Sequence, residues 1–246
     1  MNLRRIDINC DLGEGIGNDE AIMPYISSAN IACGGHAGNK KTVAKTIELA
    51  IRYGVKIGAH PSYPDKKNFG RVTFPISSSA LAETLMEQIL LTQEIAFSKG
   101  QELNHIKPHG ALYHAATRND DVASLIVELV KRNFKKSILY APFRSKLADI
   151  AIKNKLGVKH EVFADRSYLS DLSLVSRQHA GAVLSDPDLI TQHVMHMVEK
   201  GKVKTINGEE IEIFAETVCV HGDHPGAVAT AAAIFKALKD KNYTIG

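Results

Sequence analysis

The sequence contains no tryptophan and only three cysteines, and its longest uninterrupted apolar run is five residues. Such a run is far short of the roughly 20 residues that a membrane helix needs, so we expect no membrane span. Cys10, Cys33 and Cys219 are widely spaced and include no CxxC pair. This usage argues against a disulfide framework and favours a reducing compartment, so a cytoplasmic protein is expected.

The chain also lacks an excess of one charge, with 30 basic and 27 acidic residues and a formal net charge of +3. This balance argues against nucleic acid or an anionic membrane as partner. The first seven residues include two arginines but no apolar stretch behind them, so a signal peptide is not expected. Apolar residues make up 44% of the 246 residues, close to globular averages. No linker or repeat is visible, and residues 1–246 are interpreted as one domain.

Short strand-like segments alternate with helix-like segments almost throughout. The expected strands are Ile6–Asp11, Ser28–Cys33, Val55–His60, His105–Pro108, Ser137–Ala141, Val158–Asp165 and Thr217–His221. Apolar residues at helical spacing predict helices over Leu81–Phe97, Asn119–Phe134, Phe143–Leu156 and Pro187–Lys200, and Pro225 is expected to begin the last helix. This alternation predicts a parallel sheet with helices packed outside it.

The fold class favoured is α/β, as a seven-stranded parallel β/α barrel. An open doubly wound sheet remains an alternative. The barrel is preferred because polar groups follow nearly every expected strand rather than two adjacent ones. Within Lys202–Ile213, Asn207-Gly208 is flanked by alternating apolar and polar residues, which predicts a hairpin with a two-residue turn.

Several expected strands carry polar residues at every second position. Asp7, Asn9 and Asp11 share one face of the first strand, and Lys107 is in the interior of the fourth. Alternate side chains of a strand face opposite ways, so aliphatic residues should face the helices and polar residues a shared interior. A buried lysine must be paired or neutralised, which suits a functional site.

The ends of six expected strands carry ionisable groups, and active sites of parallel α/β folds lie at those ends. The candidate catalytic residues are Asp11, His60, Lys107 and His109. The candidate binding residues are Asn9, Glu14, His36, Tyr63, Arg71, Tyr113, Asp165, Arg166, His221 and Asp223. Each histidine alone could instead be structural, Asp165 and Arg166 could form a plain ion pair, and the two tyrosines could be wall residues.

Metal and nucleotide signals are weaker. Asp11, His36 and His60 are a plausible ligand set for a divalent metal, although no HExxH spacing supports it. The glycines between Gly13 and Gly17 do not form GxGxxG, and the chain has no Walker A motif. Cys10 and Cys33 have apolar neighbours and are expected to be buried rather than nucleophilic.

Six ordered segments resemble the LamB/YcsF family, and together they extend over nearly the whole chain. The segments are Ile8–Gly15, Ser28–Gly34, Gly58–Asp65, Lys107–Tyr113, Glu161–Arg166 and Cys219–Asp223. The resemblance implies a seven-stranded β/α barrel related to glycoside hydrolases and polysaccharide deacetylases. It also implies ATP-dependent opening of 5-oxoproline to L-glutamate, performed as the A component of a 5-oxoprolinase together with subunits B and C.

The chain departs from the family pattern at a few positions. Gly35 stands where the family usually has an aromatic residue, Asn39 where it has Asp, Leu172 where it has Gly, and His114 where it has Asn. Val72 stands in place of one of two usual arginines, leaving Arg71.

For the reaction implied, we expect Asp11 or a nearby histidine to act as general base. Lys107, His109 and Arg71 would stabilise negative charge, while His60, His221 and Asp223 would position the ring. ATP is the expected co-substrate, bound largely by partner subunits, and several copies of this chain could assemble. Two alternatives remain open: a metal-dependent deacetylase or amidohydrolase acting alone, and a non-catalytic scaffold subunit.

Overall fold

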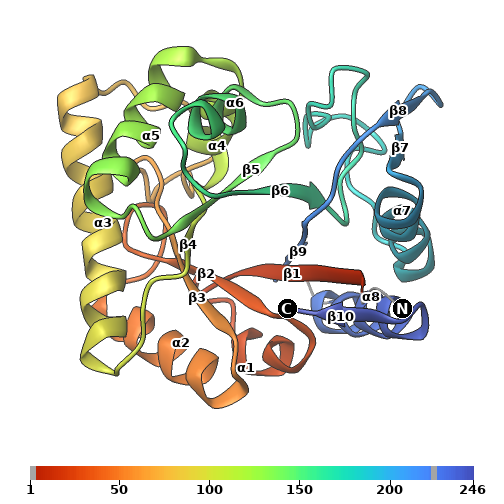
Figure 1. Ribbon diagram of the computed structural model, residues 1–246, viewed down its shortest axis with the longest axis horizontal. Coiled ribbons are helices and arrows are strands. Elements are labelled where there is room, and N and C mark those ends of the chain that lie inside the picture. The colour runs from red at the N-terminus through yellow and green to blue at the C-terminus, as the bar shows by residue number, and fades with distance from the viewer. Residues whose placement is uncertain (1–3, 223–225) are drawn as a thin grey trace.

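A computed structural model describes residues 4–222 and 226–246, and its centre is a closed barrel of seven parallel strands (Figure 1). The barrel strands are β1 (Arg4–Leu12), β2 (Ser28–Ala32), β3 (Lys56–His60), β4 (His105–Ile106), β5 (Ile138–Pro142), β6 (Val158–Phe163) and β9 (Thr217–His221). Each strand pairs with the next in this order, and β9 also pairs with β1. That last pairing closes the ring, so the barrel is confirmed and the open sheet was wrong.

The observed strands lie where they were expected, but four are shorter, β2 and β3 by one residue each and β4 and β6 by two. β4 has two residues, and β6 ends at Phe163, two residues before the predicted end. One further strand, β10 (Tyr243–Ile245), pairs with the first residues of β1 outside the ring. Its three residues begin two residues after the last helix and carry no alternating pattern long enough to predict a strand.

Helices cover the outside of the barrel, as Figure 1 shows. They are α1 (Asp19–Ile22), the 3₁₀ turn η1 (Met23–Tyr25), α2 (Lys40–Tyr53), α3 (Ser78–Ser98), α4 (Gly110–Arg118), α5 (Asp120–Asn133), α6 (Lys146–Lys153), α7 (Pro187–Lys200) and α8 (Ala227–Asp240). The cap expected at α7 is present, since the Asp186 side chain accepts a hydrogen bond from the Asp188 amide. Pro225 lies outside the described residues. No helix in the described ranges has the length and apolar character to cross a membrane.

The longest connection in the barrel runs from β6 to β9, and it contains α7 and a separate hairpin. Strands β7 (Lys202–Lys204) and β8 (Glu210–Glu212) are antiparallel, which confirms the predicted hairpin. The turn is longer than the expected two residues. The Gly208 amide donates to the Thr205 carbonyl and Gly208 has a φ of 86°, so five residues connect the strands.

The barrel strands divide their side chains as the alternation predicts. In β1, Ile6, Ile8 and Cys10 belong to the buried apolar core. Asp7 and Asn9, the residues between them, bond to side chains of β2, β6 and β9 across the interior. The interior is therefore polar, and the structure has to satisfy each of these groups with a partner.

Candidate active site

The amino-terminal end of the barrel interior is closed by hydrogen bonds to Asp7. Its carboxylate accepts from the hydroxyls of Ser28 at 2.7 Å, Tyr140 at 3.2 Å and Thr217 at 2.5 Å. Burial raises the pKa of Asp7, but the Lys159 ammonium and these hydroxyls outweigh it and the net shift is downward. Both oxygens of the Asp7 carboxylate therefore accept hydrogen bonds, and Asp7 is a structural anion at the end of the barrel opposite the candidate site.

Amide and imidazole groups occupy the middle of the interior. The Asn9 amide donates to Glu161 Oε1 at 3.0 Å, and the Asn30 amide donates to Asn9 Oδ1 at 2.7 Å. His105 Nε2 lies 2.8 Å from Asn30 Oδ1, and burial lowers the pKa of His105 to about 3, so the neutral ring donates. Gly58 makes room for this ring, because a Cβ there would lie 2.1 Å from His105 Nε2.

Lys107 lies above this layer, 2% exposed, with its ammonium surrounded by acceptors. Nζ is 2.9 Å from Asp11 Oδ1, 3.0 Å from Glu161 Oε1 and 3.0 Å from Cys219 Sγ. Burial opposes its charge, but the two carboxylates outweigh burial and raise the pKa of Lys107 well above its usual value. A permanent positive charge therefore stands between two acidic side chains.

Asp11 links Lys107 to the histidines at the mouth of the barrel. Its Oδ1 pairs with Lys107, and its Oδ2 lies 3.3 Å from His60 Nε2. Burial raises the pKa of Asp11, yet its contacts with His60 and Lys107 overcome that effect and hold it well below the usual value. The carboxylate is thus ionised, and Asn30 orients it through a further bond at 2.8 Å.

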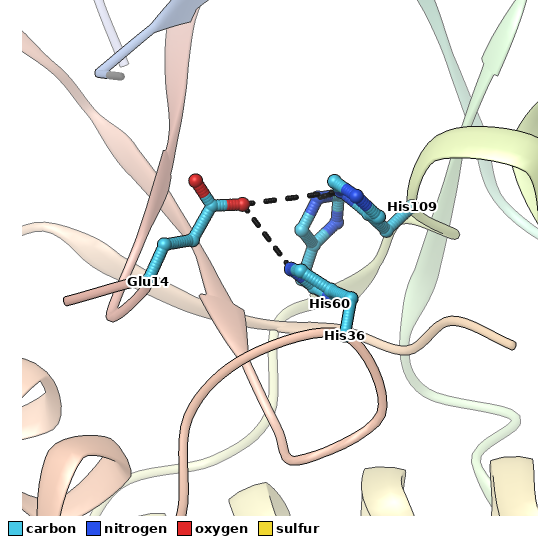
Figure 2. A group of neighbouring side chains, drawn as sticks. All are labelled: Glu14, His36, His60 and His109. Atoms are coloured by element: carbon cyan, nitrogen blue, oxygen red, sulfur yellow. Dashed lines mark hydrogen bonds and ion pairs between the residues drawn. The ribbon is translucent and has the colours of Figure 1, made fainter. Parts of the chain in front are cut away.

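Four side chains converge beside Asp11, from the loops after β1, β2 and β4 and from the end of β3 (Figure 2). His36 and His109 are stacked with ring centroids 3.6 Å apart, and His36 Nε2 lies 3.1 Å from Glu14 Oε1. His109 Nδ1 lies 2.9 Å from His60 Nε2. Glu14, His36, His60 and His109 offer ligand atoms that all lie within 4.8 Å of one another, as a metal site would require.

The remaining predicted residues occupy the rim. His221 Nδ1 is 2.7 Å from Asp165 Oδ1, so the partner of Asp165 is His221. The Arg166 guanidinium bonds to the Val175 carbonyl and so braces the following loop. Arg71 lies over the Phe69 ring.

Both tyrosines are buried. Tyr113 donates to Glu161 Oε2 at 2.5 Å, which brings it into the Lys107 network. Tyr63 is 4% exposed and belongs to the core. Asp223 lies outside the described residues.

Comparison with known proteins fits this arrangement. The model of the LamB/YcsF family matches residues 6–246. The chain belongs to the LamB/YcsF family. It is 42% identical to the A component of 5-oxoprolinase from Pyrococcus horikoshii, over 98% of this chain and 96% of that protein.

Two solved structures extend the comparison. The lactam utilization protein from Thermus thermophilus superposes with a TM-score of 0.91 at 33% identity, covering 98% of each chain. The structure described as T48 deacetylase with substrate has a TM-score of 0.52 at 15% identity, over 99% of this chain and 88% of that one. At that identity the second likeness shows the fold alone.

Sequence reasoning missed two residues that contact Lys107, Glu161 and Cys219, as well as Asn30. A signal was present for Glu161, because alternation along β6 places Lys159, Glu161 and Phe163 on one face. Both Lys159 and Glu161 do reach the interior, where they pair with Asp7 and Lys107. Cys219 contacts Lys107, but burial keeps the pKa of its thiol well above the usual value, so it is no nucleophile.

The structure accommodates the departures from the family pattern. A Cβ at Gly35 would lie 2.4 Å from Gln88 Oε1. The side-chain amide of Gln88 accepts a hydrogen bond from the Ser62 backbone N–H and donates one to the Ser62 carbonyl, both at 2.9 Å. Asn39 caps α2 in place of the usual Asp, accepting from the amides of the first turn. Leu172 has a φ of 64°, the left-handed conformation that a glycine adopts without strain.

Proposed function

We propose that this chain is the A component of an ATP-dependent 5-oxoprolinase, which hydrolyses the lactam of 5-oxo-L-proline to L-glutamate together with subunits B and C in the cytoplasm. The observation that carries the proposal is the Lys107 ammonium, buried between Asp11 and Glu161 at the mouth of the barrel. Such a group is suited to a substrate whose carbonyl oxygen gains negative charge. The names of the relatives agree with this chemistry.

A lactam is a poor electrophile, and phosphorylation of its amide oxygen by ATP would make the carbonyl carbon easier to attack. Water then adds to that carbon, the C–N bond breaks, and the ring nitrogen takes a proton and leaves as the amine. A second water hydrolyses the resulting acyl phosphate to the side-chain carboxylate of glutamate and inorganic phosphate. In this scheme Lys107 stabilises the developing oxyanion or the phosphate. Asp11 accepts the proton of the attacking water, and the Asn30 amide holds the carboxylate in position.

A small cavity next to this network could receive the substrate. It has a volume of about 100 Å³ and is lined by Tyr113, Glu161 and Phe163 together with Arg118. The Arg118 guanidinium is a suitable partner for the carboxylate of 5-oxoproline. Because the chain has no Walker A motif, ATP is assigned mainly to the partner subunits.

The test is glutamate release from 5-oxoproline and ATP, measured with this protein alone and with subunits B and C. In a folded complex, Lys107→Ala should lower the kcat for glutamate release by about 10²–10³-fold. Lys159→Met is the matched control, since Lys159 pairs with Asp7 at the opposite end of the same barrel.

Release that survives in Lys107→Ala would refute the catalytic assignment and favour a scaffold. Hydrolysis of simple amides by this chain alone, without ATP, would support instead the second candidate, a metal-dependent amide hydrolase. That candidate is favoured by the four convergent side chains of Glu14, His36, His60 and His109.

A further inference from the structure

Two backbone carbonyls determine which ring nitrogen carries the proton in two of the clustered histidines. His60 Nδ1 lies 2.7 Å from the Lys107 carbonyl, and His109 Nε2 lies 2.9 Å from the Phe69 carbonyl. A carbonyl oxygen only accepts, so both of these nitrogens must be N–H donors. The other two nitrogens, His60 Nε2 and His109 Nδ1, face each other at 2.9 Å. In neutral rings both carry lone pairs, and the contact is repulsive unless a positive species lies against both.

Two more donor atoms point to the same place. Glu14 Oε1 is 3.1 Å from His36 Nε2 and 3.9 Å from His109 Nδ1. In a tetrahedral site with metal–ligand bonds of about 2.0–2.1 Å, neighbouring ligand atoms are about 3.3 Å apart. The separations of 2.9, 3.1 and 3.9 Å between these donors span that value. A single proton shared by two imidazoles would not account for the convergence of Glu14 and His36.

We propose that Glu14, His36, His60 and His109 bind one divalent transition-metal ion, Zn²⁺ by preference, through the four atoms that converge in Figure 2. Three imidazoles and one carboxylate suit zinc and its first-row neighbours, whereas Mg²⁺ and Ca²⁺ prefer oxygen ligands. The bonds from His60 and His109 to backbone carbonyls are the outer contacts that usually orient a ligating imidazole. Glu14 and His109 thus join His36 and His60, which the sequence indicated, whereas Oδ1 of Asp11, the third residue of that predicted set, pairs with Lys107.

The ion would also adjoin Asp11, whose Oδ2 lies 3.3 Å from the ligand atom of His60. The inference goes beyond the proposed reaction and does not depend on it.

The experiment is metal binding by the full chain, with no substrate or partner protein present. The protein is stripped with a chelator, dialysed, and titrated with Zn²⁺ and with Co²⁺, whose visible absorption reports coordination number. We expect one ion per chain by elemental analysis and a four-coordinate Co²⁺ spectrum. Glu14→Gln and His109→Ala should each weaken binding by about 100-fold. His114→Asn, on α4 outside the cluster, should bind as the native chain does.

Two results would overturn the proposal. One is a correctly folded native chain that takes up neither ion at millimolar concentration. Nitrogen-15 shifts showing a doubly protonated His60 would then explain the 2.9 Å contact. The other is unchanged affinity in Glu14→Gln, which preserves the shape of the side chain and is not expected to unfold the barrel. Circular dichroism of each variant separates lost binding from lost fold.

Discussion

Replacing Lys107 by methionine should destabilise the barrel strongly, because it removes the one cation between two buried carboxylates. Lys107 is 2% exposed, and it lies 2.9 Å from Asp11 and 3.0 Å from Glu161. Removal of one partner from a buried ion pair costs about 3–5 kcal/mol, since the other charge is left without compensation. In a chain of this size that loss corresponds to a fall in Tm of about 6–20 °C.

A double-mutant cycle separates this electrostatic effect from lost packing. Glu161→Gln removes one of the two carboxylates while keeping an acceptor for the Tyr113 hydroxyl, which bonds to Glu161 at 2.5 Å. Introduced into Lys107→Met, the second change removes one of the uncompensated charges. We expect the double variant to be more stable than the sum of the single changes predicts, by about 1–3 kcal/mol.

The assay is urea unfolding followed by far-ultraviolet circular dichroism, because the sequence has no tryptophan to report by fluorescence. The m-values must agree among the four proteins for the free energies to be comparable. A coupling energy below about 0.5 kcal/mol, the error of additivity for independent sites, would refute the claim that Lys107 and Glu161 compensate each other.

Three further predictions concern single positions. Gly58→Ala should displace the His105 ring and lower Tm, since the added Cβ would lie 2.1 Å from Nε2, and differential scanning calorimetry measures this. Burial lowers the pKa of His221, but Asp165 has the larger, opposite effect, so the pKa is raised in the folded state. Protonated His221 therefore stabilises the fold fully below about pH 6.5, and this stabilisation is lost as the pH rises through the folded pKa. Burial raises the pKa of Asp165, but His221 lowers it more, to about 2. Ionised Asp165 therefore stabilises the fold above about pH 3.8, and this stabilisation is lost as the pH falls towards 2. Urea titrations from pH 2 to 9 should show both changes in the native chain and neither in His221→Gln. Leu172→Val should destabilise the loop by about 1–2 kcal/mol relative to Leu172→Gly, because a β-branched residue resists a φ of 64°.

The fold and the inward direction of Asp11 and Lys107 could be predicted because both depend on strand periodicity. Asp11 is in β1 and Lys107 directly follows β4, and parallel strands in a barrel direct such alternate positions inward. The same rule would have found Glu161 on β6, but the alternation of side chains was applied to other strands and not to this one. His105 likewise belongs to a structural layer, which periodicity alone does not distinguish from a catalytic one.

The histidine cluster could not be predicted in detail, since its geometry depends on backbone atoms of loops. Which nitrogen of His109 is free depends on the Phe69 carbonyl, and no pattern of residue types shows where that carbonyl points. Asp11 was expected among the metal ligands for its place at a strand end. In the structure Oδ1 of Asp11 pairs with Lys107, and Glu14, three residues further along the loop, reaches His36.

The loop that carries Phe69 also accounts for the close approach of the histidines. Phe69 and Gly70 have φ values of 55° and 61°, and a Cβ at Gly70 would lie 2.9 Å from His36 Cβ and 3.0 Å from His109 Cδ2. The Gly70 carbonyl in turn accepts from the Ala111 amide at the start of α4, directly after His109. Backbone held in the left-handed region persists only where its surroundings over-determine it, and it is frequent at functional sites. The loop therefore holds two imidazoles in a stack and aims a carbonyl at one of them, which leaves the free nitrogen of His109 directed at His60.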